Sequence, residues 1–235
     1  MFSYYGSKSK IVHLYPTPKY DDINEPFAGS ARYSLRFWDR NITLIDKYPV
    51  IVEVWKYLQQ ASVKDILGLP KLKKGMLISD IKTISKEEKL LLGFLAGQGG
   101  MTPRNKVSPR SDFKELHTPN LYKNLASNLY KIKHWKIICG DYRDLENKNA
   151  TWFIDPPYKF GGEHYKESNK NIDFKELANW CKSRNGQTIV CENTKANWMP
   201  FKSIAKIQGA ANVSTTEAIW SNLETAYDWQ QRSLF

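Results

Sequence analysis

The residues best suited to chemistry form one run, Asp155-Pro156-Pro157-Tyr158, which directly follows an expected strand at residues 151–154. Two consecutive prolines cannot donate to a sheet ladder and hold the backbone in an extended turn. An aspartate at the carboxyl end of a strand faces the crevice in which open α/β sheets bind ligands. The Asp155 carboxylate, the Pro156 carbonyl and the Tyr158 ring could together hold a planar amine by two acceptors and a stacking surface. The alternative is a structural proline turn beside a core tyrosine.

A second candidate site is the run Asn24-Glu25-Pro26-Phe27-Ala28-Gly29-Ser30-Ala31-Arg32, in which a strand leads through small residues into a helix. Small residues let a ligand approach the backbone, and the amino end of a helix offers free N–H groups. Asp46 follows the next expected strand, 17 residues after Gly29. An acidic residue roughly 20 residues beyond such a turn can hold the hydroxyls of a ribose. A tight packing turn and a helix N-cap are the structural alternatives.

The N-terminal run Tyr5-Gly6-Ser7-Lys8 ends like a phosphate-binding loop. The complete spacing of that loop is missing, and no strand precedes the run, which excludes a P-loop. The histidines do not cluster with the cysteines at the spacing of metal ligands, so we expect no metal site.

The net charge of +11 indicates a polyanionic partner, with nucleic acid first. A basic surface kept for solubility is the alternative. The excess is uneven, because residues 59–135 carry 14 basic and 6 acidic residues, whereas residues 1–58 carry 8 and 6 and residues 136–235 carry 13 and 12. A polar loop broken by prolines, residues 101–110, lies in the basic part. It is either a solvated loop or a DNA-contacting one, and its candidate contacts are Arg104, Lys106 and Arg110.

Strands and helices are expected to alternate at both ends of the chain, which is typical of a parallel sheet with crossover helices. The expected strands are 22–25, 42–45, 137–139, 151–154, 188–191, 203–208 and 217–220, of which the last two are expected to pair antiparallel. The expected helices are 29–38, 50–58, one capped by Ser85 with Glu88, one opening at Thr118-Pro119 and one capped by Asp173.

The chain has 235 residues, of which 41% are hydrophobic and 25% charged, the composition of a globular protein with one large or two small domains. Three cysteines favour a reducing compartment over a disulfide framework. No apolar run approaches the ~20 residues that span a bilayer. The first residues lack the pattern of a signal peptide. We therefore expect a soluble, cytoplasmic protein without membrane contact.

Together and in this order, the motifs resemble those of the Dam-like DNA adenine-N6 methyltransferases of the alpha arrangement. Tyr5-Gly6-Ser7-Lys8 resembles the aromatic-glycine-lysine motif, Glu25-Pro26-Phe27-Ala28-Gly29 the cofactor motif, and Asp155-Pro156-Pro157-Tyr158 the catalytic motif, which is the most specific of the three. The resemblance covers most of the chain. It departs at Ala31, where the family usually has a second glycine, and at Arg32, which replaces a small polar residue.

The resemblance implies an α/β fold with a Rossmann-like S-adenosylmethionine-dependent methyltransferase sheet, formed by residues 1–58 and 136–235. A small, mainly helical target-recognition domain would be inserted at residues 59–135. The implied methyl donor is S-adenosylmethionine, without a metal. The catalytic residues would be Asp155, Pro156, Pro157 and Tyr158. Those implied to bind the cofactor are Tyr5, Lys8, Phe27, Ala28, Gly29, Asp46, Asp141, Tyr142 and Asp155.

The implied reaction is site-specific methylation of the N6 amine of an adenine flipped out of double-stranded DNA, in a bacterial or phage-infected cell. The carboxylate and the Pro156 carbonyl would accept the N–H groups of the amine, and Tyr158 would stack on the base. The alternatives are a cytosine-N4 or RNA adenine methyltransferase, and a relative that binds nucleic acid without catalysis. The sequence indicates neither the recognised site nor a second subunit or partner endonuclease.

Overall fold

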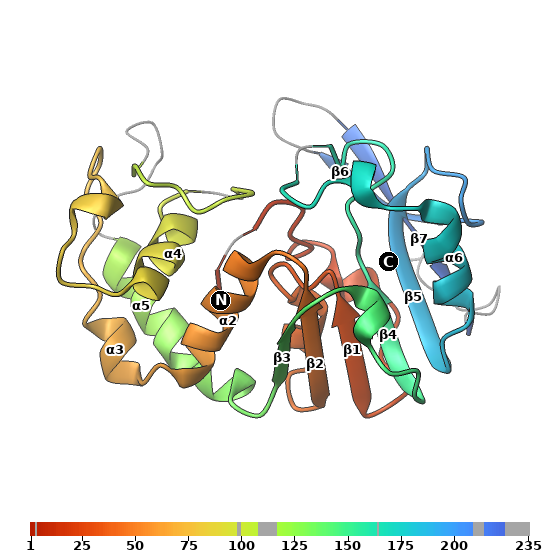
Figure 1. Cartoon of the computed structure of the whole chain (residues 1–235), viewed down its shortest axis with the longest axis horizontal. Coiled ribbons are helices and arrows are strands. Elements are labelled where there is room, and N and C mark those ends of the chain that lie inside the picture. Colours follow the sequence, from red (N-terminus) through yellow and green to blue (C-terminus); the bar gives the residue numbers. More distant parts are fainter. Residues whose placement is uncertain (3, 98–99, 108–116, 164, 209–213, 224–235) are drawn as a thin grey trace.

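The computed structural model describes the whole chain except residues 3, 98–99, 108–116, 164, 209–213 and 224–235. Its described strands form one seven-stranded sheet in the order β3-β2-β1-β4-β5-β7-β6 (Figure 1). β1 to β5 run parallel, and β7 is antiparallel to both of its neighbours. The strand bounds are β1 Asp22–Pro26, β2 Asn41–Asp46, β3 Lys136–Cys139, β4 Ala150–Ile154, β5 Gly186–Asn193, β6 Lys202–Gln208 and β7 Ser214–Ser221.

Helices flank this sheet and fill the segment between β2 and β3. The α-helices are α1 Arg32–Arg36, α2 Pro49–Gln60, α3 Val63–Leu67, α4 Lys86–Leu95, α5 His117–Ser127 and α6 Phe174–Lys182. Short 3-10 helices are η1 Val12–Leu14, η2 Ile78–Asp80, η3 Leu129–Ile132, η4 Tyr142–Asp144 and η5 Asn169–Asn171. Figure 1 shows α3, α4 and α5 beyond the β3 edge of the sheet and α6 near β5.

The sequence predicts the central strands well because they are buried on both faces. All five residues of β4 are buried, as are six of the eight in β5. Such strands appear in sequence as short apolar runs, typical of a parallel sheet covered by helices. The expected antiparallel pairing of the last two strands is confirmed by β6 and β7. The expected α/β fold, a mainly parallel sheet with helices between its strands, is therefore the observed one.

The helix expected over residues 29–38 is the main local error, because α1 covers only Arg32–Arg36. The residues before it form a turn, in which Phe27, Gly29 and Ala31 have φ angles of 60°, 46° and 45°. Left-handed backbone cannot continue into a right-handed helix, and it is costly for residues with a side chain. The turn therefore replaces the first helical residues.

The expected capping box at the start of α4 is confirmed. The Glu88 backbone N–H donates to Ser85 Oγ at 3.2 Å, and the Ser85 N–H donates to Glu88 Oε2 at 2.6 Å. These two bonds satisfy donors that the first helical turn leaves free.

The inserted helices share their core with the sheet. Phe2 packs its ring against Trp55 of α2 and Phe94 of α4, with ring centroids 5.2 and 5.3 Å apart. Trp135, just before β3, packs on Trp55 at 5.7 Å. The N-terminal segment is therefore a bridge between α2 and α4, and the boundaries of a separate domain at residues 59–135 stay a prediction. None of the helices in the described ranges combines the length and the apolar character needed to cross a membrane.

Gly186, at the start of β5, allows β4 and β5 to approach, and we predict that Gly186→Ala is strongly destabilising. Its φ is +96°, and an added Cβ would lie 2.3 Å from the Ala150 carbonyl oxygen. Gly75 is the matched control, since its φ is +75° but a Cβ there would meet nothing within 4 Å. Urea unfolding should show a loss of about 1 kcal/mol for Gly75→Ala and of about 3 kcal/mol or more for Gly186→Ala. Equal losses would contradict the role of close approach.

Candidate active site

Two adjoining cavities open at the carboxyl ends of the central strands. The larger encloses about 180 Å³, between the loops that follow β1, β2, β3 and β4. The smaller lies between the N-terminal segment and the turn after β1. Both are lined by the same five residues, Tyr4, Phe27, Gly29, Asp155 and Tyr165. We call the two cavities together the crevice.

Asp155 lies where the two cavities meet, with its side chain 22% exposed. Its position follows from the sheet, because β4 ends at Ile154 and the next two residues are prolines. Burial raises the pKa of Asp155 to about 6, even though the neighbouring Lys8 ammonium favours the ionised form. The carboxylate is therefore mainly ionised at neutral pH, open to a ligand, and able to accept hydrogen bonds or a proton.

A buried polar network holds the residues around Asp155. The Lys8 ammonium lies 3.1 Å from Asp155 Oδ1 and donates to the Tyr158 hydroxyl at 2.6 Å. The Tyr158 hydroxyl in turn donates to Glu217 Oε1 at 2.6 Å, and Tyr15 donates to the same oxygen at 2.7 Å. Burial acts to lower the pKa of Lys8, but the carboxylates of Asp155 and Glu217 outweigh it, and that pKa lies above its ordinary value. Lys8 is therefore a charged group in this network.

Asp46 connects the ends of β1 and β2. Its Oδ2 accepts from the Gly29 backbone N–H and its Oδ1 from that of Tyr48, both at 2.9 Å. Burial raises the pKa of Asp46 to about 6, against the effect of these two hydrogen bonds. Each carboxylate oxygen keeps further acceptor capacity toward the larger cavity. An added Cβ on Gly29 would lie 3.1 Å from the Tyr4 ring, so the turn needs glycine both for this approach and for its positive φ.

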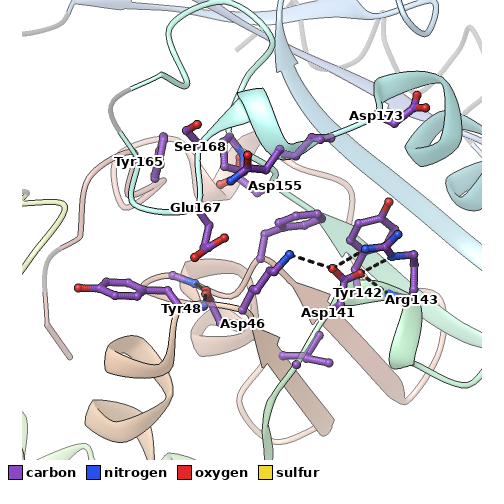
Figure 2. Close-up of a pocket in the computed structure, with 18 of the residues that line it drawn as sticks. Asp46, Tyr48, Asp141, Tyr142, Arg143, Asp155, Tyr165, Glu167, Ser168 and Asp173 are labelled. Carbon is purple, nitrogen blue, oxygen red and sulfur yellow. Dashed lines mark hydrogen bonds and ion pairs between the residues drawn. The ribbon is translucent and has the colours of Figure 1, made fainter.

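Asp141 and Tyr142, which follow β3, line the larger cavity beside Asp46. The Asp141 carboxylate accepts hydrogen bonds from the Arg143 side chain, one of them from Nε at 2.7 Å. These hydrogen bonds lower the pKa of Asp141. The Tyr142 ring lies 5.3 Å from the Phe27 ring, and its hydroxyl donates to Glu176 at 2.8 Å. Figure 2 shows Asp46 and Asp141 on one side of the cavity and Asp155 with Tyr165 on the other. The larger cavity thus combines aromatic surface with carboxylate acceptors.

Most residues expected in the site lie together at the crevice. The larger cavity is lined by Phe27, Gly29, Asp46, Asp141, Tyr142, Asp155 and Pro157. The smaller is lined by Tyr5, Lys8 and Ala28, together with the shared residues. Pro156 and Tyr158 line neither cavity: Pro156 is buried, and the Tyr158 hydroxyl accepts from Lys8. The expected DNA contacts Arg104 and Lys106 are exposed and line neither cavity, and Arg110 lies outside the described residues.

Several side chains at or beside the crevice were not predicted, among them Tyr4, Tyr165 and Glu217. Tyr4 lines both cavities, as does Tyr165, whose hydroxyl donates to the Tyr5 carbonyl oxygen at 3.4 Å. Glu217 reaches the network from β7. Tyr4 directly precedes the predicted motif Tyr5-Gly6-Ser7-Lys8, which was the only sequence signal for these three side chains. Within the described part of the chain, no group of three or more His, Cys, Asp or Glu residues could hold a metal ion.

Comparisons with known proteins leave the function to be argued from these residues. No protein-family model matches the chain, and no curated protein matches it in sequence. One solved structure that it resembles is titled "Putative methyltransferase yhhF from Escherichia coli", with a TM-score of 0.36 and 12% sequence identity. The match covers 84% of this chain and 74% of that one. A similarity of this size carries no argument about activity.

The ion pair between Lys8 and Asp155 makes a prediction about titration. Lys8→Met removes the cation that favours the ionised carboxylate, so the pKa of Asp155 should rise further above about 6. Asp46 is the internal control, because its pKa is also about 6 but its hydrogen bonds come from Gly29 and Tyr48. Carboxyl-carbon NMR titration should show the Asp155 midpoint move while that of Asp46 stays. A shift of both, or of neither, would contradict the pairing.

Proposed function

We propose that this chain is an S-adenosylmethionine-dependent DNA methyltransferase that methylates the N6 amine of a flipped adenine. The observation that carries the proposal is the position of Asp155, on a turn held by two prolines, at the junction of the two cavities. One cavity suits a nucleoside-containing cofactor, and the carboxylate at the junction suits an amine. The motif also resembles the catalytic motif of the Dam-like family.

The residues of the larger cavity fit the adenosine part of S-adenosylmethionine. Asp46 has acceptor capacity for the ribose hydroxyls. The Tyr142 and Phe27 rings offer apolar surface for the base, and the Asp141 carboxylate lies beside them. The methionine end would then extend toward Asp155 and the smaller cavity. When bound, S-adenosylmethionine supplies a methyl group on a positively charged sulfur, whose carbon is strongly electrophilic.

The residues of the Asp155-Pro156-Pro157-Tyr158 motif would help the N6 amine of adenine, a poor nucleophile, to react. The exocyclic nitrogen of adenine is conjugated with the ring, so its lone pair would be drawn out of the ring to form the new N–C bond, while the bond between sulfur and the methyl carbon breaks and sulfur leaves as a neutral thioether. Asp155 and the Pro156 carbonyl would accept its two N–H groups and hold it in line with the methyl carbon. The ionised Asp155 would also stabilise the positive charge that develops on this nitrogen, and can accept the released proton. Tyr158 would stack on the base.

The substrate amine is enclosed within a duplex, so the base must leave the stack to reach Asp155. The excess of basic residues at 59–135 would supply contacts to the phosphates. Arg104 and Lys106 are exposed in this segment and are the proposed contacts among the described residues.

The first test is the methylated base itself. DNA from cells that express the chain should contain N6-methyladenine, measured by nucleoside mass spectrometry. Asp155→Asn keeps the shape but loses the charge and one acceptor, and should lower methylation by about a hundredfold or more. N4-methylcytosine in place of N6-methyladenine would overturn the substrate assignment. Equal inactivity of a folded wild type and the variant would favour a relative that only binds nucleic acid.

The cofactor assignment can be tested separately by calorimetric titration with S-adenosylmethionine. Asp46→Asn should weaken binding by about tenfold or more, because it removes a charged acceptor for the ribose. Asp65→Asn is the matched control, since Asp65 also accepts a backbone N–H, from Ser62 at 2.8 Å, but lines neither cavity. Unchanged affinity in Asp46→Asn would show that the ribose lies elsewhere.

A further inference from the structure

Glu217 is a buried carboxylate that belongs to none of the motifs. It comes from β7, the strand that joins the sheet between β5 and β6, and its side chain is only 4% exposed. Its Oε1 lies 3.5 Å from the Lys8 ammonium and accepts from the hydroxyls of Tyr158 and Tyr15. Burying a charge costs roughly several kcal/mol unless the charge is paired and hydrogen-bonded, as the Glu217 carboxylate is here. A carboxylate so placed needs a physical explanation.

The charges around Lys8 do not balance one to one. One ammonium faces two carboxylates, Asp155 at 3.1 Å and Glu217 at 3.5 Å, so the three groups carry a net negative charge. Without Glu217, Lys8 and Asp155 would form a neutral pair. A neutral pair would stabilise a cationic nitrogen much less than a free carboxylate does, because the ammonium repels the same charge that the carboxylate attracts.

The nearby Glu192 does not supply this charge. It is buried on β5, and its Oε2 accepts from the Lys159 backbone N–H at 2.8 Å and from Trp198 Nε1 at 3.0 Å. Lys159 and Trp198 lie in the loops after β4 and β5, and the hydrogen bonds of Glu192 in the described part of the chain involve neither Lys8 nor Tyr158. Glu217 is therefore the second counter-ion of Lys8.

We propose that Glu217 is a positioning residue that takes up the charge of Lys8 and thereby leaves the charge of Asp155 available to the substrate amine. It also fixes the Tyr158 hydroxyl, and so the ring that would stack on the base. The inference rests on the proposed methyl transfer, since it is the positive charge developing on the amine that needs an uncompensated carboxylate. Lys8 then has a structural use, which is to hold Asp155 and Tyr158 in place, without cancelling the charge used in the reaction.

The test is a double-mutant cycle on the charges of Lys8 and Glu217, in which kcat is measured at saturating S-adenosylmethionine and DNA. Glu217→Gln keeps an oxygen that can accept from both tyrosines but removes the charge, and it should lower kcat by about tenfold or more. Glu192→Gln is the matched control and should change kcat by less than about threefold. The double variant Lys8→Met with Glu217→Gln removes both charges and restores the uncompensated Asp155, so it should regain at least about threefold over Glu217→Gln alone.

A merely structural role for Glu217 gives a different result, because a second change in the same network would then leave kcat equal or lower. That result, or a Glu217→Gln variant as active as wild type, would overturn the proposal. Thermal unfolding of the wild type, Lys8→Met, Glu217→Gln and the double variant gives a readout that needs no activity. At pH 8, Lys8→Met leaves two carboxylates facing each other and should lower the unfolding temperature more than the double variant does.

Failure of the inference can be told from failure of the proposed function. A wild type that transfers no methyl group to any nucleic acid would end the proposed function. The unfolding temperatures of the Lys8 and Glu217 variants would still decide whether Glu217 is the counter-ion of Lys8. Unfolding temperatures that simply add across the cycle would overturn that pairing.

Discussion

The ion pair between Lys8 and Asp155 is the interaction on which the site depends. A carboxylate below the surface needs a partner, and here the partner comes from the N-terminal segment. Lys8 can reach Asp155 only because that segment crosses the carboxyl ends of the central strands, held by Phe2 between α2 and α4. The aromatic anchor thus supports the ion pair.

The parallel sheet explains why residues from distant parts of the sequence meet. β1, β2, β3 and β4 run the same way, so the loops that follow them meet at one edge. Asp46 is the last residue of β2, and Asp141 and Asp155 follow β3 and β4. These three carboxylates could repel each other, but each has its own donors: backbone N–H groups for Asp46, Arg143 for Asp141 and Lys8 for Asp155. Their different partners allow them to serve different ligand groups.

Local patterns were enough to predict much of this arrangement. Apolar runs identified the buried strands, and the double proline identified the turn that carries Asp155. The turn after β1 was taken for the start of a helix because Ala31, Leu35 and Trp38 have helical spacing, whereas Gly29 donates its backbone N–H to Asp46 and both Gly29 and Ala31 have positive φ angles. Glu217 could not be found from sequence, since its partners Lys8, Tyr15 and Tyr158 are brought to it only by the strand order.

The central claim is that Asp155 receives the amine of an extruded adenine beside the methyl donor. The most direct measurement is a crystal structure with an unreactive S-adenosylmethionine analogue and a duplex that contains the methylated site. The account predicts the N6 atom at hydrogen-bond distance from the Asp155 carboxylate, about 3 Å, with the analogue's reacting position on its other side. An analogue bound away from the crevice, or an adenine still stacked in the duplex with Asp155 facing only protein, would contradict it.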